Sequence, residues 1–343
     1  MSNIYNRKII SNDPTTLPGS ALEFYGDSIT IGQSVSTSQR WTALVCAALS
    51  KTEQNYGVGG YQWQDATRIV YNNHVDGIPS FLAFGVNDVT RNQTRFDQIQ
   101  RIVQSLALYC TLPAANKVNA RNATASSGWT NTGLFNTIGL MTNAAASNNS
   151  SNNVFTPTNP TLSTTVKGRY VGLSATVVNT ASATNNWTLT VTIDGNTMAG
   201  SPITFYNALD TSLSDIKGSF GPYLLLYDLG SAATGVSHTI SISAAAVGTY
   251  IDRAFVDYFF GFDNGLNTAV PVFLVQPTNF EYPFYTSITP SGSPAQMNVY
   301  NDMLRETARY FSIQLGLPVK FIAEPLTQTF GNLNTDLVHP NTN

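Results

Sequence analysis

Short apolar runs alternate with amphipathic stretches over the first third of the chain. Ala21–Tyr25 and Ser80–Phe84 have the length of strands, and a glycine follows each of them. Arg40–Leu49 and Arg95–Tyr109 place apolar residues three and four positions apart, which is the spacing of one helix face. Strands that alternate with helices predict an α/β fold, in which helices cover both faces of a parallel sheet.

The middle of the chain has a different pattern, in which β-branched residues alternate with polar ones and no long helical spacing occurs. Asp194 and Gly195 form a hairpin turn signal directly after one of these alternating segments. Several short strands at this spacing predict an antiparallel β-sandwich. The strands expected are Val171–Val178, Trp187–Ile193, Thr239–Ala244 and Ile251–Phe260.

The first pattern returns near the end of the chain. Val270–Val275 and Val319–Ala323 are predicted to be strands, and Ala295–Leu315 a long amphipathic helix between them. The simplest interpretation is an α/β domain with a β domain inserted at a loop, where extra residues cost little free energy. The expected division is an N-terminal extension at 1–20, the α/β domain at 21–116 and 264–343, and the inserted β-sandwich at 117–263.

Charged residues make up only 11% of the 343 residues, which is less than half of the roughly 25% typical of globular proteins. The net charge of −3 provides no basic surface for a phosphate backbone, so we expect no nucleic-acid partner. No apolar run reaches the ~20 residues that span a bilayer, and the first residues do not resemble a secretory signal. The composition favours an extracellular or virion location, with the bacterial cytoplasm or another export route as the alternative.

The cysteines and histidines are few. Cys46 is expected to be a buried thiol on a helix and Cys110 to end another helix, and a disulfide between them stays open. His74 is expected in a solvated loop, and His238, which precedes a predicted strand, is expected to be structural. With three histidines far apart and no cysteine pair, the sequence predicts no zinc site.

Two segments carry candidate chemistry. Gly26, Asp27 and Ser28 follow the first predicted strand, and Asp336 precedes His339 by three residues. A serine at the tip of a parallel strand presents its hydroxyl, and a carboxylate near a histidine can orient the imidazole as a general base. The Gly-Asp-Ser tripeptide alone is more often a helix cap, so further segments are needed to support catalysis.

Two further segments lie between these, one of them after the second predicted strand. Asn55–Gly60 is a glycine-rich turn whose backbone N–H groups can converge, and Asn87 places a carboxamide after the strand that ends near Phe84. Ligands bind at the carboxyl edge of parallel sheets, so the Ser28 amide, the Gly60 amide and the Asn87 side chain are expected to surround one point. Such donors would form an oxyanion hole, with Gly59 as a close rival to Gly60.

In this order, the four segments resemble the conserved blocks of the SGNH (GDSL) hydrolase family, whose members are serine esterases on a flavodoxin-like, three-layer αβα sheet. The resemblance implies that Ser28 is the nucleophile and that Gly60 and Asn87 complete the oxyanion hole. It also implies that His339 acts as general base and then acid, and that Asp336 orients it. No metal or organic cofactor is implied.

The resemblance covers residues 20–112 and 268–340 and leaves out the β insertion. In the family a closing helix normally follows the histidine block, whereas this sequence ends four residues past His339. Tyr61, Trp63 and Tyr282 are expected to border the substrate pocket, with packing in the core or in a loop as the alternative. Asp27 and Asp88 are expected to cap helices or to brace the site.

The substrate is predicted from composition and analogy. The insertion and the Asn/Ser/Thr-rich, weakly charged sequence resemble phage tail-fibre or tailspike esterases, which deacetylate bacterial surface polysaccharide. The expected partner is therefore an acetylated bacterial polysaccharide, without membrane insertion, and a tail protein would be expected to form a trimer. The alternatives are a bacterial carbohydrate O-acetylesterase, a lipase or thioesterase of the same family, and a non-catalytic receptor-binding tail protein.

Overall fold

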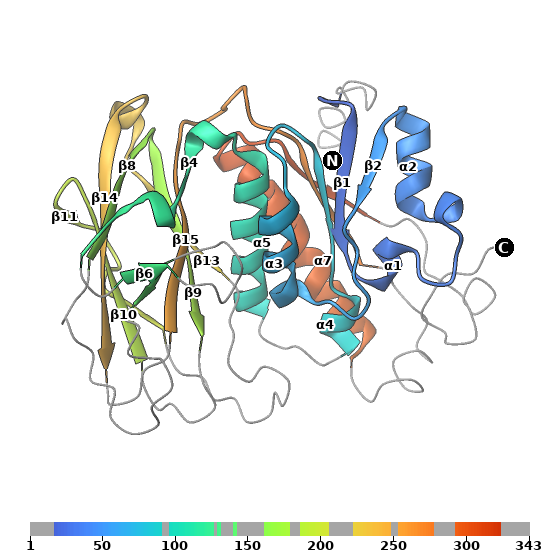
Figure 1. Cartoon of the computed structure of the whole chain (residues 1–343), viewed down its shortest axis with the longest axis horizontal. Helices are drawn as coiled ribbons and strands as arrows, with labels where there is room; N and C mark the ends of the chain where they lie inside the picture. Colours follow the sequence, from blue (N-terminus) through green and yellow to red (C-terminus); the bar gives the residue numbers. More distant parts are fainter. Residues whose placement is uncertain are drawn as a thin grey trace, which may run out of the picture.

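The computed structural model describes residues 17–90, 96–126, 129–131, 140–142, 161–178, 186–205, 222–247, 253–277 and 292–323. These residues form successive layers (Figure 1). A parallel sheet lies at one end of the molecule, two antiparallel sheets lie at the other, and a layer of helices separates them.

The parallel sheet has the order β17-β16-β3-β1-β2, and every neighbouring pair in it is parallel. All its strands therefore end at the same edge of the sheet. Counted in chain order within this sheet, the strand order is 2-1-3-4-5. Its strands are β1 (Ala21–Gly26), β2 (Thr52–Asn55), β3 (Ser80–Ala83), β16 (Val272–Val275) and β17 (Val319–Ile322).

Apolar side chains cover both faces of this sheet, which explains the unbroken apolar runs in the sequence. On one face, Leu22, Phe24 and Phe81 pack with α2. On the other, Tyr25 and Leu82 belong to a larger core that includes the remaining long helices. These helices are α2 (Trp41–Leu49) on the first face, and α3 (Trp63–Asn73), α5 (Phe96–Thr111) and α7 (Pro294–Arg309) on the second.

The strands between Lys117 and Phe262 form the two antiparallel sheets. One has the order β13-β9-β15-β7-β6, with β4 also paired to β15, and the other has the order β11-β10-β14-β8-β5, with β12 paired to β10. Their strands are β4 (Lys117–Asn119), β5 (Thr124–Ala125), β6 (Trp129–Asn131), β7 (Leu140–Thr142), β8 (Thr161–Lys167), β9 (Tyr170–Val178), β10 (Asn186–Ile193), β11 (Asn196–Thr197), β12 (Ile203–Phe205), β13 (Tyr223–Asp228), β14 (Ser237–Val247) and β15 (Arg253–Phe262).

The antiparallel sheets are not separated from the helices by solvent. Phe260 and Phe262 of β15 belong to the same buried cluster as the helices α3, α5 and α7. Polar contacts cross the same boundary: Tyr71 Oη lies 3.1 Å from Ser174 Oγ, and Ser105 Oγ donates to that oxygen at 2.8 Å. One antiparallel sheet therefore shares a core with the helices, while a second buried cluster lies between the two antiparallel sheets.

Two expectations for single residues change with the structure. The His74 side chain has no exposed surface and its Nδ1 lies 2.7 Å from Glu23 Oε2, so the prediction of a solvated loop histidine is wrong. A buried carboxylate on β1 draws the imidazole into the protein. Cys46 and Cys110 are both buried and unpaired, so the disulfide that the sequence left open does not form.

Within the described ranges, no helix combines the length and the apolar character needed to cross a bilayer. The same residues contain no group of three or more His, Cys, Asp or Glu side chains arranged to bind a metal ion.

Candidate active site

Ser28 lies directly after β1, which has β2 and β3 as its neighbours in the sheet. It is the first residue of α1 (Ser28–Ile31), a helix of one turn. Asp27 caps this helix because its Oδ1 accepts the N–H of Ile29 at 2.9 Å. The turn leaves Ser28 only 7% exposed at the carboxyl edge of the sheet. Asp27 and α1 are called the nucleophile turn below, after the role that the sequence predicts for Ser28.

The loop after β2 lies against the nucleophile turn. Val58 N–H donates to Gly26 O at 3.0 Å, which continues the pairing of β2 with β1 past the end of the strands. A Cβ built on Gly59 would lie 4.0 Å from Ser28 Cβ, so this glycine is beside the serine. Gly60 follows it with a φ of +79°, a conformation that favours glycine.

Asn87 joins the turn after β3 to the same loop. It belongs to α4 (Val86–Thr90), and its Nδ2 donates to Tyr61 O at 3.0 Å. In return, Gln62 Nε2 donates to the Asn87 carbonyl oxygen at 3.3 Å. The segments that carry Ser28, Gly60 and Asn87 therefore meet at one edge of the sheet, as their positions after successive strands predict.

Two buried carboxylates lie beneath this edge. Burial raises the pKa of Asp27 to about 7, and burial together with the charges of Asp27 and Asp65 raises that of Asp88 to about 8. Asp88 accepts the N–H of Trp63 at 3.2 Å and so caps α3, while Asp27 caps α1. The expectation that these two residues cap helices is confirmed.

The aromatic residues expected at the pocket have different positions. Trp63 is fully buried and packs on Phe84 with 5.1 Å between ring centroids, so its ring belongs to the core and the prediction that it borders the pocket is wrong. As the first residue of α3, it faces the sheet that the helix covers. Tyr61 is half-buried. Tyr282, Asp336 and His339 lie outside the described residues.

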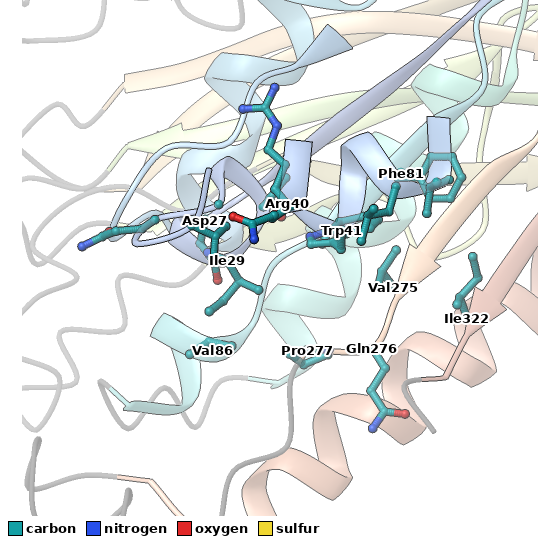
Figure 2. Close-up of a pocket in the computed structure, with 18 of the residues that line it drawn as sticks. Asp27, Ile29, Arg40, Trp41, Phe81, Val86, Val275, Gln276, Pro277 and Ile322 are labelled. Atoms are coloured by element: carbon teal, nitrogen blue, oxygen red, sulfur yellow. The ribbon is translucent and has the colours of Figure 1, made fainter. Parts of the chain in front are cut away.

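A cavity of about 440 Å³ adjoins the nucleophile turn (Figure 2). Ile29 lines it from the turn, Trp41 from α2, and Val275 and Ile322 from the ends of β16 and β17. Most of its lining side chains are apolar. The cavity lies on the face of the sheet that α2 covers in part.

No role was predicted for the side chains that hold the nucleophile turn from outside. Asn55 Nδ2 donates to Thr30 O at 2.7 Å, and Arg40 forms a two-point ion pair with Glu53. Asn55 was visible only as the start of a glycine-rich turn. The signal that could have identified it is a polar residue ending a strand that adjoins the nucleophile strand.

No protein-family model matches the chain, and no curated protein matches it. Among solved structures, a variant of the esterase AlinE4 is similar over 26% of this chain and 53% of its own, with 17% identity and a TM-score of 0.24, so the chain spans about half of that esterase. A two-domain esterase (CEX) active on acetylated mannans, co-crystallised with mannopentaose, is similar over 70% of this chain and 91% of its own, with 11% identity and a TM-score of 0.34.

The third similarity is to the CBM36-1 domain of a multidomain xylanase from the hindgut metagenome of Trinervitermes trinervoides. It covers 42% of this chain and 92% of that domain, with 18% identity and a TM-score of 0.24. These three structural neighbours are two esterases and a carbohydrate-binding module. Because each similarity is low in identity, none assigns the chain to a family.

Proposed function

We propose that this protein is a serine esterase of the SGNH type, with Ser28 as its nucleophile. The observation that carries the proposal is the position of Ser28 at the carboxyl edge of the sheet, after the interior strand β1, with the loops after β2 and β3 bonded around it. The strand order 2-1-3-4-5 is that of flavodoxin-like sheets, which bind ligands at this edge.

In the proposed reaction, Ser28 transfers its proton to His339 and attacks the acyl carbonyl carbon. The Ser28 amide, the amide of Gly60 or its rival Gly59, and the Asn87 side chain hold the oxyanion. His339, oriented by Asp336, then protonates the leaving alcohol, and water releases the acid from the serine by the same route in reverse.

The topology allows His339 to take part. β17 ends at the same edge as β1 and lies three strand positions away, which is about 14 Å at the usual spacing of strands. His339 follows Ile322 by 17 residues, and an extended segment of that length spans up to ~56 Å. The segment is therefore long enough to bring the imidazole to Ser28.

For the substrate, we propose an O-acetyl group on a polysaccharide. The support is a chain poor in charge and rich in Asn, Ser and Thr, together with an antiparallel β region that packs directly on the helices of the α/β region. Placement in a phage tail fibre or tailspike stays a prediction from the sequence.

The test is hydrolysis of p-nitrophenyl acetate by the protein and by Ser28→Ala, together with labelling by a fluorophosphonate. We expect hydrolysis to fall at least ~10³-fold in Ser28→Ala, since the nucleophile is lost. The label is expected on Ser28 by mass spectrometry. Equal hydrolysis by both proteins, or a label on another serine, would reject the proposal.

A further inference from the structure

The nucleophile turn cannot hold its own geometry, because one helical turn has too few internal hydrogen bonds to be stable. α1 ends at Gly32, which has a left-handed conformation with a φ of 77°. The carbonyl oxygens of Thr30 and Ile31 accept hydrogen bonds from side chains outside the turn. Those side chains therefore contribute to the position of Ser28, together with the backbone hydrogen bond from Val58 N–H to Gly26 O.

Asn55, the last residue of β2, supplies one of these donors. Its Nδ2 donates to Thr30 O at 2.7 Å and to Thr42 Oγ1 at 2.9 Å. Its Oδ1 accepts the N–H of Gly57 at 2.9 Å. Since a backbone N–H can only donate, the contact with Gly57 fixes which end of the amide is the oxygen. One side chain thus joins the nucleophile turn to the loop after β2.

A charged pair holds Asn55 in this orientation. Glu53 accepts hydrogen bonds from Arg40 Nε at 2.8 Å and Nη2 at 2.6 Å, from Thr42 Oγ1, and from Asn55 Nδ2 at 3.3 Å. Burial by itself would raise the pKa of Glu53, but these hydrogen bonds outweigh it and lower the pKa. Arg40 Nη1 also reaches Ile31 O at 3.4 Å. The ionised Glu53 therefore keeps the Asn55 and Arg40 side chains against the nucleophile turn.

The loop that Asn55 binds packs tightly on the nucleophile turn. A Cβ added to Gly57 would lie 2.4 Å from Ile31 N, so only glycine permits this approach. Gly59 lies beside Ser28 on the same loop. A shift of either segment would change the distance between the Ser28 amide and the amides of the loop.

We propose that Asn55 is a positioning residue for ester hydrolysis, whose side chain fixes the separation between the oxyanion donors of the nucleophile turn and those of the loop after β2. This inference rests on the serine esterase proposed above. Oxyanion donors act in the transition state, so a displaced donor lowers kcat and leaves KM nearly unchanged. Loss of a whole donor costs ~10²–10³-fold in kcat, and a displaced donor is expected to cost roughly 10–100-fold.

The experiment compares Asn55→Ala and Asn55→Asp with Asn73→Ala, measuring kcat and KM on p-nitrophenyl acetate and the thermal unfolding of each protein. Asn73 Nδ2 donates to Ile69 O at 2.8 Å within α3, so it is a matched asparagine away from the site. Asn55→Asp keeps the acceptor for Gly57 and loses the donor to Thr30. Both Asn55 variants are expected to lose roughly 10–100-fold in kcat with KM within about twofold, while Asn73→Ala keeps the wild-type kcat.

Asn55→Asp separates positioning from local folding. A wild-type kcat in this variant would overturn the inference, because the side chain would then only shape its own turn with Gly57. The Asn55→Asp variant also tests the positioning role if Asn55→Ala fails to fold. Absence of Ser28-dependent hydrolysis in the wild-type protein would reject the esterase and the positioning role together. Ser28-dependent hydrolysis with unchanged kcat in both Asn55 variants would reject the positioning role alone.

Discussion

The two ends of the parallel sheet both bury polar side chains, but they balance charge differently. Toward the amino end, the Glu23 carboxylate contacts His74 Nδ1 at 2.7 Å, Ser80 Oγ at 3.0 Å and Tyr25 Oη at 3.0 Å. At the carboxyl end, Asp27 and Asp88 accept backbone N–H groups, and the described residues place no cation in contact with either.

The pKa values follow this difference. Burial would raise the pKa of Asp76, near the amino end, but hydrogen bonds from His74 and Lys117 outweigh it and lower the pKa to about 2. Burial without such partners raises the pKa values of Asp27 and Asp88. Balanced charges are typical of a structural cluster, whereas unbalanced carboxylates at a ligand-binding edge are typical of a functional site. Burial of polar groups alone does not distinguish the two.

The largest effect is expected from His74→Ala, which breaks the balance at the amino end. Removing the imidazole leaves the buried Glu23 side chain without its contact at 2.7 Å, and an unsatisfied buried polar group costs about 1–3 kcal/mol of unfolding free energy, more where it is charged. Urea unfolding measures this loss, and kcat on p-nitrophenyl acetate is expected to stay at the wild-type value while the variant is folded.

Asp302→Ala is the control for that experiment. Its ion pair with Arg305 is exposed on α7, and such pairs contribute at most ~1 kcal/mol. Equal unfolding free energies for His74→Ala and Asp302→Ala would contradict a structural role for the amino-end cluster.

At the carboxyl end, we expect a substitution to lower kcat and to leave the stability nearly unchanged. Asn87→Ala is expected to lower kcat by ~10²–10³-fold, as for other lost oxyanion donors, with only a small loss of stability. Steady-state kinetics on p-nitrophenyl acetate measure it. Asn116→Ala is the matched control, since Asn116 Nδ2 donates to Gly261 O at 2.6 Å away from the carboxyl edge. If both variants retain wild-type kcat, Asn87 is not an oxyanion donor.

Much of the fold was predictable where burial on both faces leaves a short, mostly apolar run. β1, β3 and β16 begin and end within two residues of the predicted strands. β2 was not predicted because its residues are all polar and lie at an edge of the sheet, where Glu53 pairs with Arg40. α3 was also not predicted, although its buried face is apolar.

The candidate site was predictable only as far as strand ends determine it. Positions after the predicted strands Ala21–Tyr25 and Ser80–Phe84 placed Ser28 and Asn87 at one edge, and the glycine-rich turn placed Gly60 there. The direction of a side chain at such an end is set by tertiary packing, which is why Trp63 was misplaced. His74 was misplaced because its partner, Glu23, is 51 residues away in the sequence.

The last substitution, Asp88→Asn, tests the unbalanced charge directly. In the folded protein the pKa of Asp88 is raised from 3.8 to about 8, so between these values the unfolded chain releases a proton that the folded chain keeps. The stability from this bound proton is complete at low pH and is lost as the pH rises through the folded pKa.

The free energy of unfolding of the wild-type protein should therefore fall from pH 5 to pH 9. In Asp88→Asn it should fall by about half as much, because the raised pKa of Asp27 still makes its own contribution. Asparagine stays neutral and retains an oxygen that can accept the Trp63 N–H. Urea unfolding at several pH values measures both slopes, with the exposed Asp302→Asn as the control. Parallel slopes for wild type and Asp88→Asn would mean that Asp88 is balanced in the folded protein, and the contrast between the two ends of the sheet would then rest on Asp27 alone.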